Sequence, residues 1–184
     1  MLKLNPIWQP EIQQSHYRIL LDAMSHPGRR YSVTTQREEA PMALTILATL
    51  LDAEVSLADP HGLLKNKDAF MLQAKLVKAD QADYILCDGS LIPDFEPKLG
   101  TLPCPDQSAT LILVVDKIGQ GNINLKLKGP GIAETERLDM SGIDAHWFSK
   151  REDWVCSFPL GVDLIFVDDT QVVAIPRTTK VELI

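Results

Sequence analysis

Residues 157–179 read SFPLGVDLIFVDDTQVVAIPRTT, and this segment gives the clearest structural signal in the chain. Two short apolar runs, 162–167 and 172–175, are rich in valine, isoleucine and phenylalanine, which suit a buried pleated surface. The residues between them, from Asp168 to Gln171, include an Asp-Asp-Thr sequence that is typical of a turn. The segment therefore predicts a β-hairpin whose two strands both lie inside a sheet.

Two charged side chains, Asp163 and Arg177, lie at the open end of this predicted hairpin. Proline cannot donate a hydrogen bond to a sheet ladder, so Pro176 should end the second strand and Arg177 should leave the sheet. There Arg177 either binds an anion or a partner through its planar fork, or simply covers the strand end. Asp163 lies in an apolar run and needs a partner if buried, with Arg177 or backbone amides as candidates. It serves either as a structural hydrogen-bonding group or as an acid or base with a raised pKa.

Composition places the chain among ordinary globular proteins. Its 184 residues fit one domain, 1–184, and 45% of them are hydrophobic. A net charge of −7 without a block of basic residues argues against an autonomous nucleic-acid-binding protein. The sequence contains neither an apolar run long enough to span a membrane nor a signal-peptide pattern at its start. We therefore expect a cytoplasmic protein that contacts neither membrane nor nucleic acid.

Cysteine and histidine are scattered rather than clustered. The 3 cysteines and 4 histidines form no CxxC, HxH or HExxH motif, which predicts free thiols and no bound metal. The chain also lacks a GxSxG motif for a nucleophilic serine. The residues alone thus indicate an α/β domain without a self-sufficient active site.

Hydrophobic periodicity indicates helices that alternate with strands. Helices are predicted at 10–24, 41–51, 68–76 and 142–155, and strands at 31–35, 54–58, 84–87, 110–115 and 122–128, besides the hairpin. Residues 119–121 should form a hairpin turn, and the proline-rich segment 92–107 a long loop with at most one helical turn, at 95–99. This pattern predicts a three-layer α/β/α sandwich around a mixed sheet.

Two further segments offer anion-binding chemistry, each with a plainer alternative. Gly129-Pro130-Gly131 follows a predicted strand and either cradles a phosphate with its amides or forms a tight turn. Arg29 and Arg30 follow the helix stop at 26–28 and either bind an anion or complement the negative end of that helix.

Four blocks of sequence together resemble the PhnH family, subunits of the bacterial carbon–phosphorus lyase system. The blocks are YRILLDAMSHPG (17–28), SATLIL (108–113), LKGPGIAE (127–134), and FPLGVDL (158–164) with AIPRTT (174–179). They extend over nearly the whole chain in the family's order, whereas residues 52–107 match only loosely. Each block is weak alone, but the combination is specific.

The resemblance implies a fold similar to that of pyridoxal-phosphate-dependent transferases, without the cofactor. It also implies a homodimer that joins subunits G, I and J. Together they make α-D-ribose 1-methylphosphonate 5-triphosphate from ATP and methylphosphonate, and subunit J later cleaves the C–P bond. The chain would then be a component of a multi-subunit transferase, inactive by itself, which acts as a scaffold or contributes a phosphate- or nucleotide-binding pocket.

The matching blocks supply the candidate ligand- or partner-binding residues. These are Arg18, Gly28, Gly129, Gly131, Asp163, Arg177, Thr178 and Thr179. No catalytic residue, metal or cofactor is expected. Exposed apolar and aromatic residues in the 92–107 loop and near Trp147 and Trp154 are expected to support dimerisation.

Overall fold

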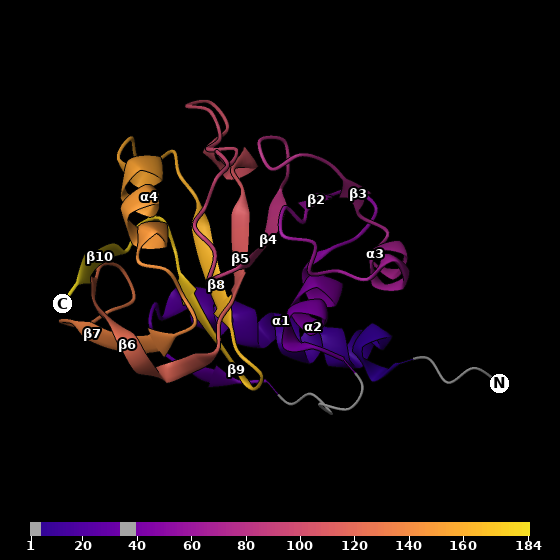
Figure 1. The fold of residues 1–184 in the computed structure, drawn as a ribbon, viewed down its shortest axis with the longest axis horizontal. Helices are drawn as coiled ribbons and strands as arrows, with labels where there is room; N and C mark the ends of the chain where they lie inside the picture. The colour runs from indigo at the N-terminus through magenta and orange to yellow at the C-terminus, as the bar shows by residue number, and fades with distance from the viewer. Residues whose placement is uncertain (1–4, 34–39) are drawn as a thin grey trace.

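The computed structural model describes residues 5–33 and 40–184, and a mixed seven-stranded sheet forms its centre (Figure 1). In spatial order the strands are β1 (Tyr31–Ser32), β9 (Gln171–Ile175), β8 (Asp163–Val167), β5 (Thr110–Val114), β4 (Tyr84–Asp88), β2 (Ser56–Ala58) and β3 (Lys75–Leu76). A second, three-stranded antiparallel sheet contains β10 (Lys180–Leu183), β6 (Lys117–Lys128) and β7 (Glu136–Ser141). The helices are α1 (Pro10–Ser25), α2 (Met42–Leu50), α3 (Asn66–Leu72) and α4 (His146–Val155), with short 3-10 turns at Pro6–Trp8 and Pro105–Gln107.

The predicted hairpin is confirmed. β8 and β9 pair antiparallel, with Leu164 opposite Ile175, and β8 also pairs in parallel with β5. Asp168 holds the turn, because its Oδ1 accepts the backbone N–H groups of Thr170 and Gln171, each at 2.7 Å. The strand ends at Ile175, directly before the proline, as expected.

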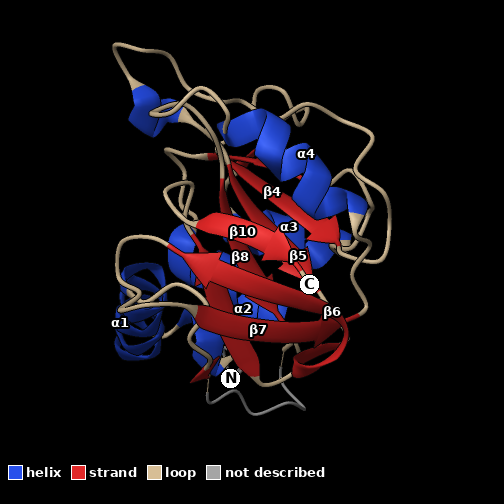
Figure 2. Ribbon diagram, turned by 90° about the vertical axis from the view of Figure 1, so that its left-hand side faces the viewer, coloured by secondary structure: helices blue, strands red, loops and turns tan. Residues whose placement is uncertain are grey.

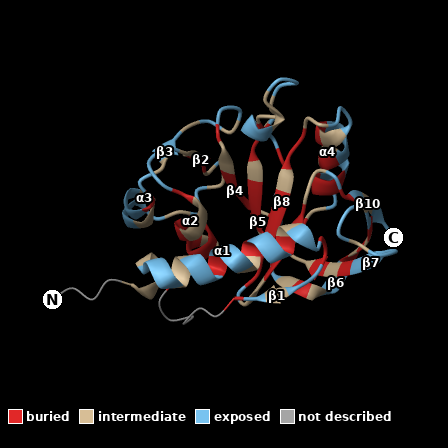
Figure 3. Cartoon of the chain, turned by 180° about the vertical axis from the view of Figure 1, so that it is seen from behind, coloured by how far each residue is buried: buried red, intermediate tan, exposed pale blue. Residues whose placement is uncertain are grey.

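The large sheet is covered on both faces, which explains why its central strands are apolar throughout. α1, α2 and α3 cover one face (Figure 3). On that face Ile46, Leu86 and Ile165 belong to one buried cluster. The other face packs against α4 and the small sheet (Figure 2). The predicted layers are thus present, but one outer layer combines a helix with a sheet. Likeness to the pyridoxal-phosphate transferase fold stays a prediction.

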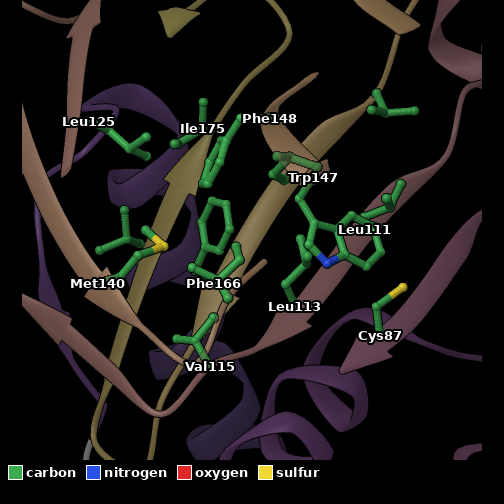
Figure 4. Packing of buried hydrophobic residues seen from close by; sticks show 14 of the residues in the cluster. Cys87, Leu111, Leu113, Val115, Leu125, Met140, Trp147, Phe148, Phe166 and Ile175 are labelled. Carbon is green, nitrogen blue, oxygen red and sulfur yellow. The ribbon is translucent and has the colours of Figure 1, made fainter. Parts of the chain in front are cut away.

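The aromatic residues of α4 are buried rather than exposed, contrary to the expectation for Trp147 and Trp154. Figure 4 shows Trp147 and Phe148 among apolar side chains of the large sheet, including Phe166. The Phe148 and Phe166 rings stack with their centroids 6.2 Å apart. α4 therefore packs its tryptophans into the buried cluster between itself and the large sheet and does not present them for dimerisation.

The prediction of a turn at 119–121 was wrong, because these residues lie inside the long strand β6. The pairing with β7 shifts between Ile118 and Ile123, and the backbone of Met140 lies where a Cβ on Gly121 would be. Glycine permits this close approach and a bulge replaces the turn. Two strands, β7 and β10, were not predicted, because charged residues interrupt their short apolar alternation.

Three boundaries also differ from prediction. α3 ends at Leu72, Gln73 takes a left-handed conformation, and Lys75–Leu76 pair with β2 instead of continuing the helix to 76. The helical turn expected at 95–99 does not form; the turn in this loop is at Pro105–Gln107. Of the strand predicted at 31–35, Tyr31–Ser32 are found as β1, and 34–35 lie outside the described residues.

No helix in the described ranges combines the length and apolarity needed to cross a membrane.

Candidate functional site

Arg177 and Asp163 meet at one end of the hairpin. Asp163 is the first residue of β8 and Arg177 follows the end of β9, so antiparallel pairing brings them to the same sheet edge. The Arg177 backbone N–H donates to Asp163 Oδ1 at 2.7 Å, and Nη2 donates to Oδ2 at 2.6 Å. Both side chains are about 15% exposed or less. Asp163 thus has the partner that its position in an apolar run requires.

The remaining donors of Arg177 are also used within the chain. Nη1 donates to the carbonyls of Pro105 at 2.8 Å and Pro159 at 3.4 Å, and Nη2 also donates to Ser108 Oγ. With Nε on Asp163, all five N–H donors of the guanidinium have acceptors. Arg177 therefore joins the hairpin, the loop before β5 and the segment before β8, and its guanidinium does not point outward.

A cavity of about 710 Å³ lies beside this cluster. The turn at 177–180, the end of α4 and Phe158 form its walls, and Pro130 and Val181 line it as well. Arg151, Arg177 and Lys180 bring positive charge to the lining, whereas Glu152 is its acidic residue. The cavity is thus locally basic although the chain carries a net charge of −7.

Arg151 is the most deeply buried of these charges, with an exposed fraction of 1%. Its Nη2 donates to the carbonyls of Pro176 at 2.7 Å and Thr179 at 2.9 Å. Its Nε is buried without a hydrogen-bond acceptor among the described residues. Burial lowers the pKa of Arg151 to about 10, and the charges of Asp163 and Glu152 act in the opposite direction.

Sequence reasoning missed Arg151. The residue lies on the apolar face of α4, in the helical series Trp147, Arg151 and Trp154, which are all buried. An arginine three or four residues from two tryptophans, on the same face of a predicted helix, is the pattern that could have identified it. Its lack of a carboxylate partner, however, is visible only once the chain is folded.

The predicted site residues divide into two groups. Gly129 lies against the turn of Thr178 and Thr179, since a Cβ there would be 3.0 Å from the Thr178 carbonyl oxygen. Thr179 is buried and its Oγ1 has no hydrogen-bond partner in the described ranges, whereas Thr178 is exposed. The pairing of Lys128 with Lys180 explains this closeness, because it sets β10 beside β6.

The other predicted residues lie away from the cavity. Gly131 packs against the backbone of Ser25, and Gly28 packs against Leu127, with φ angles of +81° and +83°. Both glycines thus allow the end of α1 to approach the small sheet closely. Arg18 is exposed on α1 and is not part of the cavity lining.

Arg29 and Arg30 border a second cavity of about 310 Å³ together with Arg137. Glu136 and Asp139 line the same cavity and offset the positive charge. The Arg29 guanidinium also lies over the Tyr31 ring, 5.6 Å from its centroid. This second cavity is therefore the more nearly charge-balanced of the two.

The large cavity lies at the amino edge of the parallel strands, because Asp163 begins β8 and Ser108 precedes β5. Ligands of open α/β sheets more often bind at the carboxyl edge. Fold analogy therefore does not predict its ligand, which has to be inferred from the residues that line it. In the described parts of the chain, no group of three or more His, Cys, Asp or Glu residues could hold a metal ion.

Comparison with known proteins identifies relatives along nearly the full length. Residues 7–182 match the family described as bacterial phosphonate metabolism protein (PhnH). A candidate C–P lyase subunit protein, HtxG of Stutzerimonas stutzeri, is 40% identical over 177 residues, which are 96% of this chain and 89% of the relative. The α-D-ribose 1-methylphosphonate 5-triphosphate synthase subunit PhnH of Rhizobium meliloti is 29% identical over 181 residues, 92% of this chain and 90% of the relative.

Proposed function

The chain belongs to the PhnH family of bacterial phosphonate metabolism proteins, and from this we propose that it is a subunit of a carbon–phosphorus lyase complex. The observation that carries the proposal is the family match over residues 7–182, supported by two relatives that are named as subunits. The name of the Rhizobium relative specifies the reaction: formation of α-D-ribose 1-methylphosphonate 5-triphosphate. We assign this chain to the same step of phosphonate catabolism.

Within that complex the proposed role is structural rather than catalytic. Arg177, the most prominent charged residue of the matching segments, has every donor committed to its own chain. A guanidinium whose five donors all have acceptors within the chain holds separate segments together, which supports a structural role for this residue. The partners that the family resemblance implies are subunits G, I and J, together with a second copy of this chain, in the cytoplasm.

Exposed apolar side chains support a role in assembly. Leu91, Ile92 and Leu102 in the long loop after β4 are exposed, and so is Phe70 at the end of α3. Leu102 and Phe70 expose 73% and 82% of their surface. Large apolar side chains that remain exposed in this way are common at surfaces that bind other proteins.

Co-expression with the cognate G, I and J subunits tests the proposal. We expect a tagged form of this chain to retain the other subunits through size-exclusion chromatography. Deletion of its gene should abolish growth on methylphosphonate as the sole phosphorus source, and the intact gene should restore it. Normal growth of the deletion strain, or failure of the chain to join the complex, would contradict the proposed function.

The homodimer is tested separately on the isolated chain. Light scattering at micromolar concentration should give a mass of twice 20.5 kDa. A Leu102→Ser variant, which removes the exposed side chain from the long loop, tests whether this loop forms the contact. A mass near 20.5 kDa for the unchanged chain would contradict the dimer.

A further inference from the structure

We propose that helix α3 and strand β3 form a docking surface for an extended, acidic segment of a partner protein, which adds a strand to the open edge of the large sheet. Residues 63–78 are called the α3–β3 surface. The inference rests on the proposed function and deepens it, because it names the surface and the chemistry of one contact between this chain and the rest of the complex. The partner segment is defined by that chemistry alone, as a strand in which acidic and apolar side chains alternate.

The first observation is that β3 leaves a backbone edge open. It is the last strand of the large sheet, and no strand in the described ranges lies beyond it (Figure 1). The N–H groups of Lys75 and Val77 donate to the carbonyls of Val55 and Leu57 in the direction of β2, at 3.2 and 3.0 Å. Successive residues of a strand direct their backbone groups to opposite sides, so the N–H and C=O of Leu76 point away from β2. Such an edge is a template on which another chain can form a strand.

Exposed apolar side chains accompany this edge. Large apolar residues of the α3–β3 surface that remain exposed are Leu63, Phe70, Met71 and Leu76. Phe70 and Leu76 expose 82% and 60% of their surface. Six positions of chain span at most about 20 Å, so a single extended segment can contact both side chains. Apolar groups that stay exposed beside an open edge are typical of a surface that another protein covers.

Exposed lysines give this surface positive charge in a chain whose net charge is −7. Lys75 and Lys78 lie on the extended segment itself, beside the side chains of an added strand. Lys65 and Lys67 lie at the start of α3, and Asp68 is the acidic residue of the surface. Opposite charges on neighbouring strands attract each other, so an acidic segment fits this edge best.

The same lysines argue against a second copy of this chain as the occupant. Two β3 edges brought together would set Lys75 and Lys78 beside the same lysines of the other copy, and like charges on neighbouring strands are destabilising. Lysine on an edge strand also protects the edge from unwanted pairing. Protection alone does not require Phe70 and Leu76 to be exposed there, and these two side chains favour a specific partner.

Leu76→Pro tests the backbone edge within the complex. Proline removes the N–H that points to the open side, whereas Lys75 and Val77, which donate to β2, stay in place. We expect the tagged variant, co-expressed with the cognate G, I and J subunits, to retain roughly tenfold less of them than the unchanged chain. Leu76→Val keeps both the N–H and an apolar side chain, so this matched control should retain the subunits fully.

A double substitution, Lys75→Glu with Lys78→Glu, tests the charge of the partner. It should also reduce subunit retention roughly tenfold, because an acidic segment would then meet like charges. Both lysines are exposed, so the thermal midpoint should not change and the test remains valid even if Leu76→Pro fails to fold. Lys128→Glu with Lys180→Glu is the matched control, since it changes the net charge equally at exposed positions of the small sheet.

The outcomes separate this inference from the proposed function. If Leu76→Pro and the Lys75/Lys78 double variant both retain G, I and J as the unchanged chain does, the α3–β3 surface is not a contact and the inference is wrong, while the proposed function stands. If the unchanged chain retains none of these subunits, the proposed function fails and the inference fails with it. If Leu76→Pro converts a dimer of the isolated chain into a monomer in light scattering, a second copy occupies the surface, and the acidic partner is refuted.

Discussion

Two arginines near the amino edge of the large sheet, Arg177 and Arg151, are both largely enclosed but paired very differently. Arg177 has a carboxylate, a hydroxyl and two carbonyls for its five donors, together with a backbone bond to the same carboxylate. Arg151 has two carbonyls on a single nitrogen and no carboxylate. A fully paired guanidinium is most simply explained as structural, whereas a buried and only partly paired one leaves a desolvation cost that other parts of the fold offset.

The comparison also shows that sequence position is a poor guide to the role of a charge. Arg177 stands in the segment most like the family, where a functional residue was expected. Arg151 lies in a helix whose sequence drew attention only through its aromatic residues. Pairing, rather than motif membership, separates the two roles, and four substitutions test this from the largest expected effect to the smallest.

Arg177→Ala should lower the free energy of unfolding by about 3–5 kcal/mol, because it leaves the Asp163 carboxylate enclosed and uncompensated. Urea denaturation followed by far-ultraviolet circular dichroism measures this loss. Arg18→Ala, at an exposed position on α1, is the control and should change the value by less than about 0.5 kcal/mol. A loss below about 1 kcal/mol for Arg177→Ala would refute the structural role.

Arg151→Met should cost less, about 1–3 kcal/mol, because it leaves only the carbonyls of Pro176 and Thr179 without their donor. Methionine keeps the length of the side chain against the buried aromatic residues, so little packing is lost. The same urea titrations measure the difference. If Arg151→Met were as damaging as Arg177→Ala, the contrast between the two arginines would not hold.

Glu96→Gln tests a third charged residue, whose hydrogen bonds are more exposed to solvent. Glu96 accepts from Lys150 Nζ at 2.7 Å and from Trp154 Nε1 at 2.6 Å, linking the long loop to α4. The bond from Lys150, then that from Trp154, lowers the pKa of Glu96. A depressed folded-state pKa adds stability above the unfolded value near 4.5, and this is lost as the pH falls through the folded pKa.

Since Glu96 is 66% exposed, we expect Glu96→Gln to cost less than about 1 kcal/mol at pH 7. The difference from the unchanged chain should narrow in urea titrations as the pH falls below 4.5 and the carboxylate becomes protonated. A difference that stays constant from pH 7 to pH 3 would exclude the ionic contribution.

Thr179→Val should change stability least, by about 0.5 kcal/mol or less, and in the stabilising direction. Valine has nearly the shape of threonine, and the Oγ1 that it removes has no hydrogen-bond partner in the described ranges. Thermal unfolding should therefore show an unchanged or slightly raised midpoint. A marked fall in the midpoint would mean that the hydroxyl has a structural partner.

Local chemistry made several elements predictable. The hairpin, the helix from Pro10 and the strand at 110–114 followed from apolar runs, a proline and turn residues within a few positions. β7 and β10 were not predicted, because charged residues interrupt the short apolar alternation of both strands. For β10 the partner strand, β6, is also distant in the chain. The turn predicted at 119–121 was wrong for a different reason, because glycines suit a turn and a bulge equally well.

The sequence by itself determined the α/β class, the hairpin, the pairing candidates Asp163 and Arg177, and the family, which four short blocks identified and the comparisons confirmed. The tertiary structure decided how each charge is used. Pro105 and Ser108 reach Arg177 across about 70 positions, and Arg151 reaches the carbonyls of Pro176 and Thr179 from a different helix. The tertiary structure also separated Gly129, beside the cavity, from Gly131, beside α1. The chemistry of a side chain sets how many hydrogen bonds it can make. Which of these bonds form depends on the groups, often distant in the sequence, that packing brings within hydrogen-bonding distance.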